Sequence, residues 1–275
     1  MNYIELLGLP TTGKTFYKKN IQKKKNFMNM RYLLIKFFST INKLNFNNFI
    51  KIYILLLLNS KFVQNYKNKN KSGNIIFKNN DKIIFNSTKR SIFLKFVDYL
   101  NLNKFYLEII NHLSTYFKIK NDKLMKILLN EIQGLNQNKE FKIKLKNCII
   151  ENFLIIKILK EYKDWNCIVD EGLLYRIYLI FSLTNNKDYF IKRVLKNYSQ
   201  YGKIIILDSK IKKIISRSNL RKKNYTGYIY KNSLEIYKEF FFFNIFLQKI
   251  QKKIIFKKIK TEYFGVGLLL VSLCI

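Results

Sequence analysis

Alanine is absent from this chain of 275 residues, whereas Lys, Asn, Ile, Phe and Tyr are abundant. These abundant residues are the ones encoded by A- and T-rich codons, so codon usage explains much of the composition. The formal net charge of +35 would by itself indicate a nucleic-acid or anionic-membrane partner. Because the lysines are spread along the whole chain, we expect a dispersed basic surface and no specific nucleic-acid partner.

Cysteine, histidine and long apolar runs are also scarce. The three cysteines are odd in number and lack the spacing of a metal site, which excludes a disulfide framework and fits a reducing compartment. The single histidine, His112, lies among apolar residues at helical spacing and is expected to belong to a packed or surface helix. Residues 50–58 and 264–275 are apolar but fall short of the roughly 18 to 20 residues that cross a bilayer. We therefore expect a cytoplasmic protein with no leader segment and no membrane span.

Glycine numbers only nine, so a motif that needs two of them at fixed spacing is informative. Residues 8–15 read GLPTTGKT and satisfy the phosphate-loop pattern G-x-x-x-x-G-K-[ST]. Residues 2–7 predict a buried strand and residues 16–25 a helix, which is the context that a phosphate cradle requires. The alternative is an ordinary glycine turn between a strand and a helix. The motif predicts nucleoside triphosphate binding, with ATP as the expected cofactor, by Gly8, Pro10, Thr11, Thr12, Gly13, Lys14 and Thr15.

Further strand and helix patterns follow along the chain. Short β-prone runs occupy residues 165–169, 203–207 and 253–259, and residues 74–77 form a possible strand within a polar stretch. Apolar residues at helical spacing predict helices within 31–38, 48–58, 92–99, 105–117, 123–132, 141–159, from 173 onward and within 210–223. Strands that alternate with helices indicate a mostly parallel sheet, with ligands bound beyond the carboxyl ends of the strands.

Acidic residues stand at the end of one predicted strand. Asp170 and Glu171 directly follow the apolar run 165–169. Asp170 is the candidate carboxylate for Mg²⁺, with the Thr15 hydroxyl as a second ligand, and Glu171 is the candidate proton acceptor. Alternatively, the pair caps the helix that begins near Gly172.

Arginine is rare among the basic residues: only six of the 52 are Arg. Where codon usage favours lysine, a retained arginine suggests a site that needs a planar fork for phosphate or carboxylate. Arg217 and Arg221 are spaced i, i+4, which places both on one helix face where they can close over phosphates. The alternative is a solvated basic helix end. Arg176 and Arg90 are further candidate anion anchors.

The order of these motifs resembles P-loop kinases of the nucleoside monophosphate and thymidylate kinase type. Residues 204–208, followed by a helix with spaced arginines, look like the strand and lid helix of those kinases. Residues 4–15 and 168–176 resemble poorly characterised bacterial ATP-binding proteins of this superfamily that are often found near surface-polysaccharide genes. The Asp-Arg pair with which thymidylate kinases bind their acceptor is Asp170-Glu171 here.

The resemblance implies an α/β, three-layer P-loop NTPase fold with a mostly parallel five-stranded sheet and a large helical insertion. It places a single kinase-like domain at residues 1–263, the insertion at about 31–160 and an apolar tail at 264–275. The implied catalytic residues are Lys14, Glu171, Arg217 and Arg221.

Three functions remain open on the sequence. The first is an ATP- and Mg²⁺-dependent kinase that transfers the γ-phosphoryl group to an unidentified small molecule. The second is an NTP-binding or NTP-hydrolysing regulatory or assembly protein that acts through a partner. The third, motivated by charge and 16% aromatic residues, is binding to nucleic acid or anionic lipid.

Overall fold

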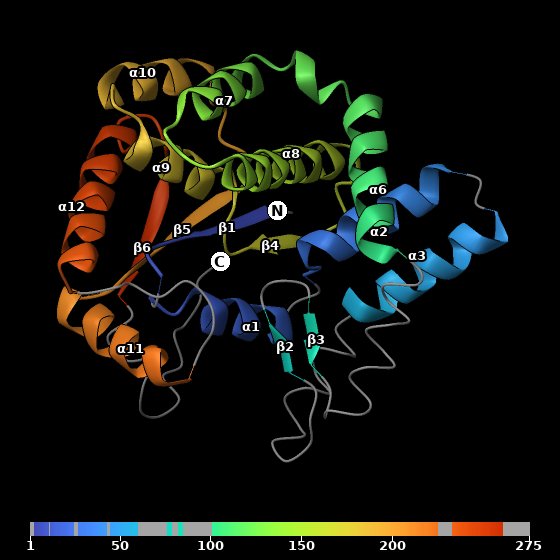
Figure 1. Ribbon diagram of the computed structural model, residues 1–275, viewed down its shortest axis with the longest axis horizontal. Coiled ribbons are helices and arrows are strands. Elements are labelled where there is room, and N and C mark those ends of the chain that lie inside the picture. Colours follow the sequence, from blue (N-terminus) through green and yellow to red (C-terminus); the bar gives the residue numbers. More distant parts are fainter. Residues whose placement is uncertain are drawn as a thin grey trace.

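The computed structural model describes residues 3–10, 12–24, 27–42, 45–59, 76–78, 82–84, 101–224 and 233–260. Within them, a four-stranded sheet lies among helices (Figure 1). Its strands are β1 (Tyr3–Leu7), β4 (Cys167–Val169), β5 (Lys203–Asp208) and β6 (Phe256–Lys260). The order is β4-β1-β5-β6 and every pair is parallel, which confirms the α/β class and the parallel sheet.

The prediction of five strands in this sheet is wrong for the described residues. The run predicted at 74–77 corresponds to β2 (Ile76–Lys78), which pairs with β3 (Lys82–Ile84) in a separate antiparallel sheet. A connection of three residues explains this pairing, because parallel neighbours need a crossover of a dozen residues or more.

The helices follow the predicted periodic segments closely. They are α1 (Lys14–Lys24), α2 (Met30–Ile41), α3 (Phe46–Asn59), α6 (Leu102–Tyr116), α7 (Lys123–Gly134), α8 (Lys139–Glu161), α9 (Leu173–Leu183), α10 (Lys187–Asn197), α11 (Ile211–Asn224) and α12 (Ser233–Ile250), with a 3-10 turn η1 at Ile119–Asn121. The helix predicted within 92–99 and the tail 264–275 lie outside the described residues.

Polar side chains fix where several helices begin. The side-chain oxygen of an asparagine accepts a backbone N–H in the first turn of α2, α3, α8 and α10, and Asp122 does the same for α7. Such caps satisfy donors that an α-helix leaves without an internal partner. The caps are Asn29, Asn45, Asn138 and Asn186.

The two faces of the sheet are buried by unequal numbers of side chains. Alternate residues of β1 point to opposite faces, so Tyr3 and Leu7 join the large core, while Ile4 and Leu6 pack with Tyr17 of α1 in a small core. Figure 1 shows α8 and α9 on one side of the sheet, with α7 and α10 beyond them, and α1 on the other.

The predicted insertion region is continuous with this core. Buried side chains of α2, α6, α7 and α8 share the large core with strand residues of the sheet. His112 lies exposed on α6 with its ring against Phe38 at 5.3 Å between centroids, as expected for a surface helix residue. The domain limits and the status of 31–160 as an insertion stay predictions.

Candidate functional site

The glycine loop, residues 8–13, connects β1 to α1, so the predicted strand and helix on either side of the motif are confirmed. A Cβ on Gly8 would lie 2.9 Å from the backbone oxygen of Leu207 and 2.8 Å from Thr12 Oγ1. Gly13 has φ of +95°, in the region that favours glycine. The backbone therefore favours glycine at both positions. An ordinary turn between a strand and a helix would favour glycine there too. The functional argument depends on the residues around the loop.

The loop threonines are placed differently. Thr12 is buried and its Oγ1 donates to the Leu9 carbonyl at 2.8 Å, while its N–H reaches the same oxygen at 3.3 Å. Thr12 therefore tightens the turn with its side chain. Thr15 is exposed in the first turn of α1, and Pro10 is half-buried. Thr11 lies outside the described residues.

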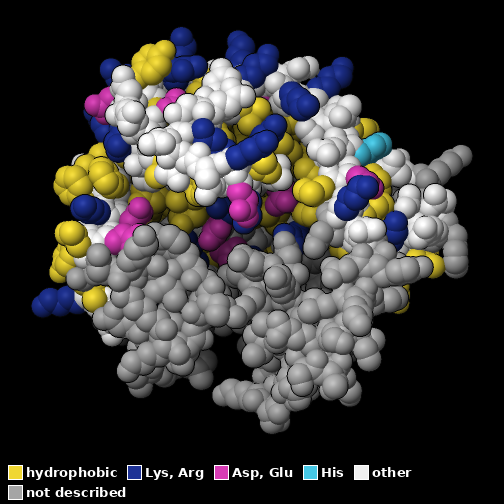
Figure 2. Space-filling model, in the orientation of Figure 1, with side chains coloured by type: hydrophobic (Ala, Val, Ile, Leu, Met, Phe, Trp, Pro, Cys, Tyr) yellow, Lys and Arg dark blue, Asp and Glu magenta, His cyan; other side chains and the backbone are white. Residues whose placement is uncertain are grey.

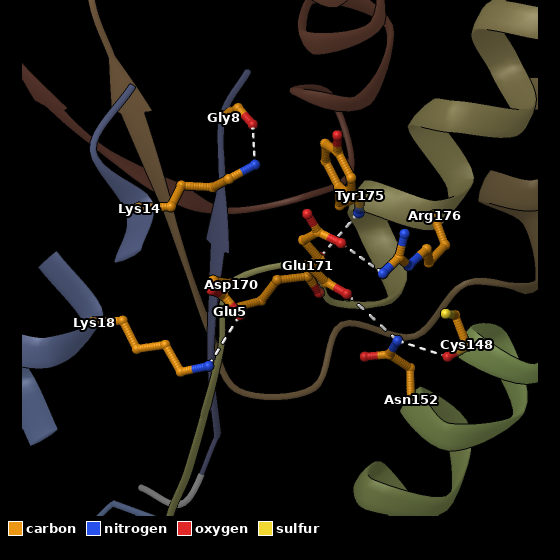
Figure 3. Close-up of polar contacts among 10 residues, drawn as sticks. All are labelled: Glu5, Gly8, Lys14, Lys18, Cys148, Asn152, Asp170, Glu171, Tyr175 and Arg176. Carbon is orange, nitrogen blue, oxygen red and sulfur yellow. Dashed lines mark hydrogen bonds and ion pairs between the residues drawn. The ribbon is translucent and has the colours of Figure 1, made fainter. Parts of the chain in front are cut away.

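Lys14 is a buried cation at the start of α1, only 9% exposed. Its Nζ donates to the carbonyl oxygen of Gly8 at 2.5 Å, so the side chain folds back over the loop (Figure 3). The ammonium also lies 4.2 Å from the centroid of the Tyr175 ring, whose π-face stabilises a cation. A lysine held this way carries its positive charge at the glycine loop.

Asp170 directly follows β4, the strand next to β1, and faces α1. Lys18, one turn after Lys14, donates from Nζ to Asp170 Oδ1 at 2.9 Å. Burial on its own would raise the pKa of Asp170, but the charge and hydrogen bond of Lys18, together with the charge of Lys14, hold that pKa below its usual value. Asp170 is therefore an ionised carboxylate beside the glycine loop.

Glu171 and Arg176 form an ion pair beside the site. Arg176 donates from Nη2 to Glu171 Oε2 at 2.7 Å, with side chains 15% and 48% exposed respectively. The alternative that Asp170 and Glu171 cap α9 is wrong: the N-cap residue is Gly172, which has no side-chain cap.

Glu5 performs that capping role from inside the sheet. This residue of β1 is 1% exposed, and its Oε1 accepts the backbone N–H of Tyr175 at 3.0 Å. Tyr3 donates its hydroxyl to Oε2 at 3.3 Å. Burial raises the pKa of Glu5 from its usual 4.5 to about 7, against the lowering effect of these hydrogen bonds. Gly172 leaves room for the carboxyl group, because a Cβ there would lie 2.3 Å from Glu5 Cδ.

Sequence reasoning missed Glu5, Lys18 and Tyr175. The sequence contains a signal for two of them. Glu5 is the one charged residue in the predicted buried strand at residues 2–7. Lys18 lies four residues after Lys14, hence on the same face of α1. The contact of Tyr175 with Lys14 joins residues 161 positions apart and left none.

The predicted lid arginines are only partly described. Arg217 is half-buried on α11, a helix that packs against α12. Arg221 lies one turn later on α11, but its side chain is outside the described residues, as is Arg90. Their role over the phosphates stays a prediction.

Basic side chains are scattered over the visible part of the described surface, between neutral and apolar areas (Figure 2). This agrees with the expected dispersed charge. No helix among the described residues is both long and apolar enough to cross a membrane. Across the described ranges, no three His, Cys, Asp or Glu side chains are grouped to hold a metal ion.

The site thus brings together Lys14, Lys18, Asp170, Tyr175 and the Glu171–Arg176 pair at the junction of β1, β4, α1 and α9 (Figure 3). Comparisons of the chain with protein-family models, with curated proteins and with solved structures gave no match.

Proposed function

We propose that this protein binds a nucleoside triphosphate in the glycine loop and transfers its γ-phosphoryl group to a small molecule, as a P-loop kinase with ATP as the expected donor. The observation that carries the proposal is the placement of Lys14. A buried ammonium folds over the loop, at the N-terminal end of α1, and an ionised carboxylate follows the adjacent parallel strand. Backbone N–H groups, a helix N-terminus and a lysine together form an anion site.

In this proposal each residue has a defined role. Lys14 gives up its contact with the Gly8 carbonyl and binds phosphate oxygens, with the first N–H groups of α1. Glu171 orients the acceptor hydroxyl and takes its proton. Arg217 and Arg221 stabilise charge on the phosphoryl group during transfer.

The residues present suit a magnesium ion. Mg²⁺ prefers oxygen ligands and usually takes one or two carboxylates together with phosphate oxygens and water. Thr15 supplies an exposed hydroxyl and Asp170 an ionised carboxylate, of which only Oδ1 is bonded to Lys18. When bound, Mg²⁺ would neutralise charge on the donor phosphates.

The test is nucleotide binding and turnover in a Lys14→Ala variant. We expect a loss of about 100-fold or more in phosphoryl transfer or ATP hydrolysis, the size typical of removing one preorganised charge-stabilising donor. Lys160→Ala is the matched control, because Lys160 also lies over a tyrosine ring, that of Tyr201 at 5.6 Å, but belongs to α8. Full activity of Lys14→Ala would overturn the proposal.

A screen of added small molecules separates the kinase from the regulatory alternative. A kinase turns over ATP faster when its acceptor is present, whereas a regulatory NTPase responds to a protein or polymer. Isothermal titration with a non-hydrolysable ATP analogue measures binding independently of turnover.

A further inference from the structure

Arg176 uses little of its hydrogen-bonding capacity. A guanidinium has five N–H donors. Among the described residues, Arg176 donates a hydrogen bond from Nη2 to Glu171. Its Nε is buried without a hydrogen-bond partner. A buried donor left unpaired is costly, so native structures that keep one need a reason.

Asn152 lies beside this arginine and also has a buried side-chain atom without a hydrogen-bond partner, in this case an acceptor. The residue is fully buried on α8, and its Nδ2 donates to the carbonyl oxygens of Cys148 at 2.8 Å and Glu171 at 3.5 Å (Figure 3). Its Oδ1 is buried without a partner. Burial raises the pKa of the Cys148 thiol while the charge of Arg176 lowers it, so this thiol, in its neutral form, competes little for the guanidinium.

Tyr175 connects this polar cluster to the glycine loop. Its ring lies 4.2 Å from Lys14 Nζ and 5.6 Å from the guanidinium carbon of Arg176. The two cations are therefore separated by no more than the sum of these distances. A small molecule that contacts Arg176 with one end can reach a phosphate held at Lys14 with the other.

Glu171 is the partner of this ion pair that can leave. Its side chain is 48% exposed, so water can solvate the released carboxylate, whereas the Arg176 side chain is 15% exposed and needs another anion in its place. An incoming phosphate or carboxylate can instead take two parallel N–H bonds from the guanidinium fork. Exchange of partners would leave the Glu171 carboxylate free beside the acceptor.

We infer that the acceptor is an anion, carrying a phosphate or carboxylate group, and that Arg176 binds this group in exchange for Glu171. The inference rests on the proposed kinase function and names the class of its substrate. In the transfer step, an acceptor hydroxyl oxygen bonds to the γ-phosphorus, the bond from phosphorus to the β,γ-bridging oxygen breaks, and the diphosphate leaves. The hydroxyl proton passes to the carboxylate that Arg176 has released.

The test uses the side-chain Nε–H signals of the arginines, of which the chain has only six. Isotope-labelled protein, saturated with Mg²⁺ and a non-hydrolysable ATP analogue, is titrated with inorganic phosphate, with acetate and with glycerol as a neutral hydroxyl compound. We expect the Arg176 signal to shift saturably with phosphate or acetate and not with glycerol. Arg176→Lys removes the Arg176 signal and so assigns it. If Arg176→Lys does not fold, Glu171→Gln assigns the signal instead, because it changes the partner of the Arg176 guanidinium.

The variants give the quantitative outcome. Phosphate binding to the nucleotide-saturated protein should weaken by about tenfold or more in Arg176→Lys, the size of one charge-assisted contact. Arg193→Lys is the control, because Arg193 also lies over a tyrosine ring, at 5.3 Å, but belongs to another helix, α10.

Three negative results are distinguishable. An Arg176 signal unmoved by either anion, with the nucleotide analogue bound, overturns the inference and leaves the kinase proposal standing. Failure of the analogue to bind overturns the kinase proposal, and phosphate binding abolished by Lys14→Ala but not by Arg176→Lys places the anion in the glycine loop instead.

Discussion

The interior of β1 holds the buried Glu5 and the carboxyl edge of the sheet holds the half-buried Asp170, and the two environments shift the carboxyl pKa in opposite directions. Glu5 is buried in the sheet, and burial raises its pKa to about 7 although the hydrogen bonds from Tyr175 and Tyr3 lower it. Asp170 lies at the edge beside Lys18 and Lys14, so its pKa falls despite burial. Opposite shifts in neighbouring carboxyl groups indicate different roles. Glu5 orders the start of α9, while Asp170 is an anion paired with Lys18 at the sheet edge.

The largest effect expected from the difference between Glu5 and Asp170 is the pH dependence of stability that Glu5 causes. Its folded pKa lies above its unfolded value, so its contribution is fully present below pH 4.5 and is lost as the pH rises through 7. The loss is about 3 kcal/mol for a shift of this size. Urea unfolding at pH 4.5 and pH 8 should show a steeper decline for the wild-type protein than for Glu5→Gln. Equal declines in the two proteins would contradict this account.

A smaller effect is expected from crowding Glu5 instead of neutralising it. Gly172→Ala places a methyl group against the Glu5 carboxyl and should destabilise the protein by about 2 kcal/mol, as overpacking of a buried site does. Gly134→Ala is the matched control, since its added Cβ meets no atom within 4 Å beyond its chain neighbours and the backbone of its own helix. The Glu5→Ala, Gly172→Ala double variant should recover part of the loss in a double-mutant cycle. Simple additivity would refute the proposed contact.

The smallest expected change concerns the edge of the sheet. Lys18→Met removes the ion pair with Asp170, so the pKa of Asp170 should rise while stability at pH 7 falls by no more than about 1 kcal/mol, because the pair is partly exposed. The Asp170 contribution is present above its usual pKa and is lost as the pH falls through the lowered value. Carboxyl-carbon NMR titration measures the shift. Lys144→Met, on an exposed pair with Glu140, should leave Asp170 unchanged.

Local sequence signals predicted the glycine loop, its flanking elements and the acidic strand end, because glycine geometry and strand and helix periods are local properties. The count of five strands came from the family resemblance, and the pairing of distant segments gives four strands in this sheet among the described residues. The placement of Glu5 against α9 also depended on tertiary contact: a charged residue in a strand does not reveal which helix start lies above it. The capping interpretation of Asp170 and Glu171 failed for the same reason.

The asparagine caps bear on how a chain without alanine evolved its helices. Alanine is the strongest helix former, and this chain builds its helices without it. The same codon pressure that removed alanine enriched asparagine, a residue that starts helices well, as it does in α2, α3, α8 and α10. Mutational bias thus supplied asparagine caps, which replace part of the helix stability lost with alanine. The chain should therefore gain stability readily from alanine at exposed positions within helices, such as Asn130 of α7.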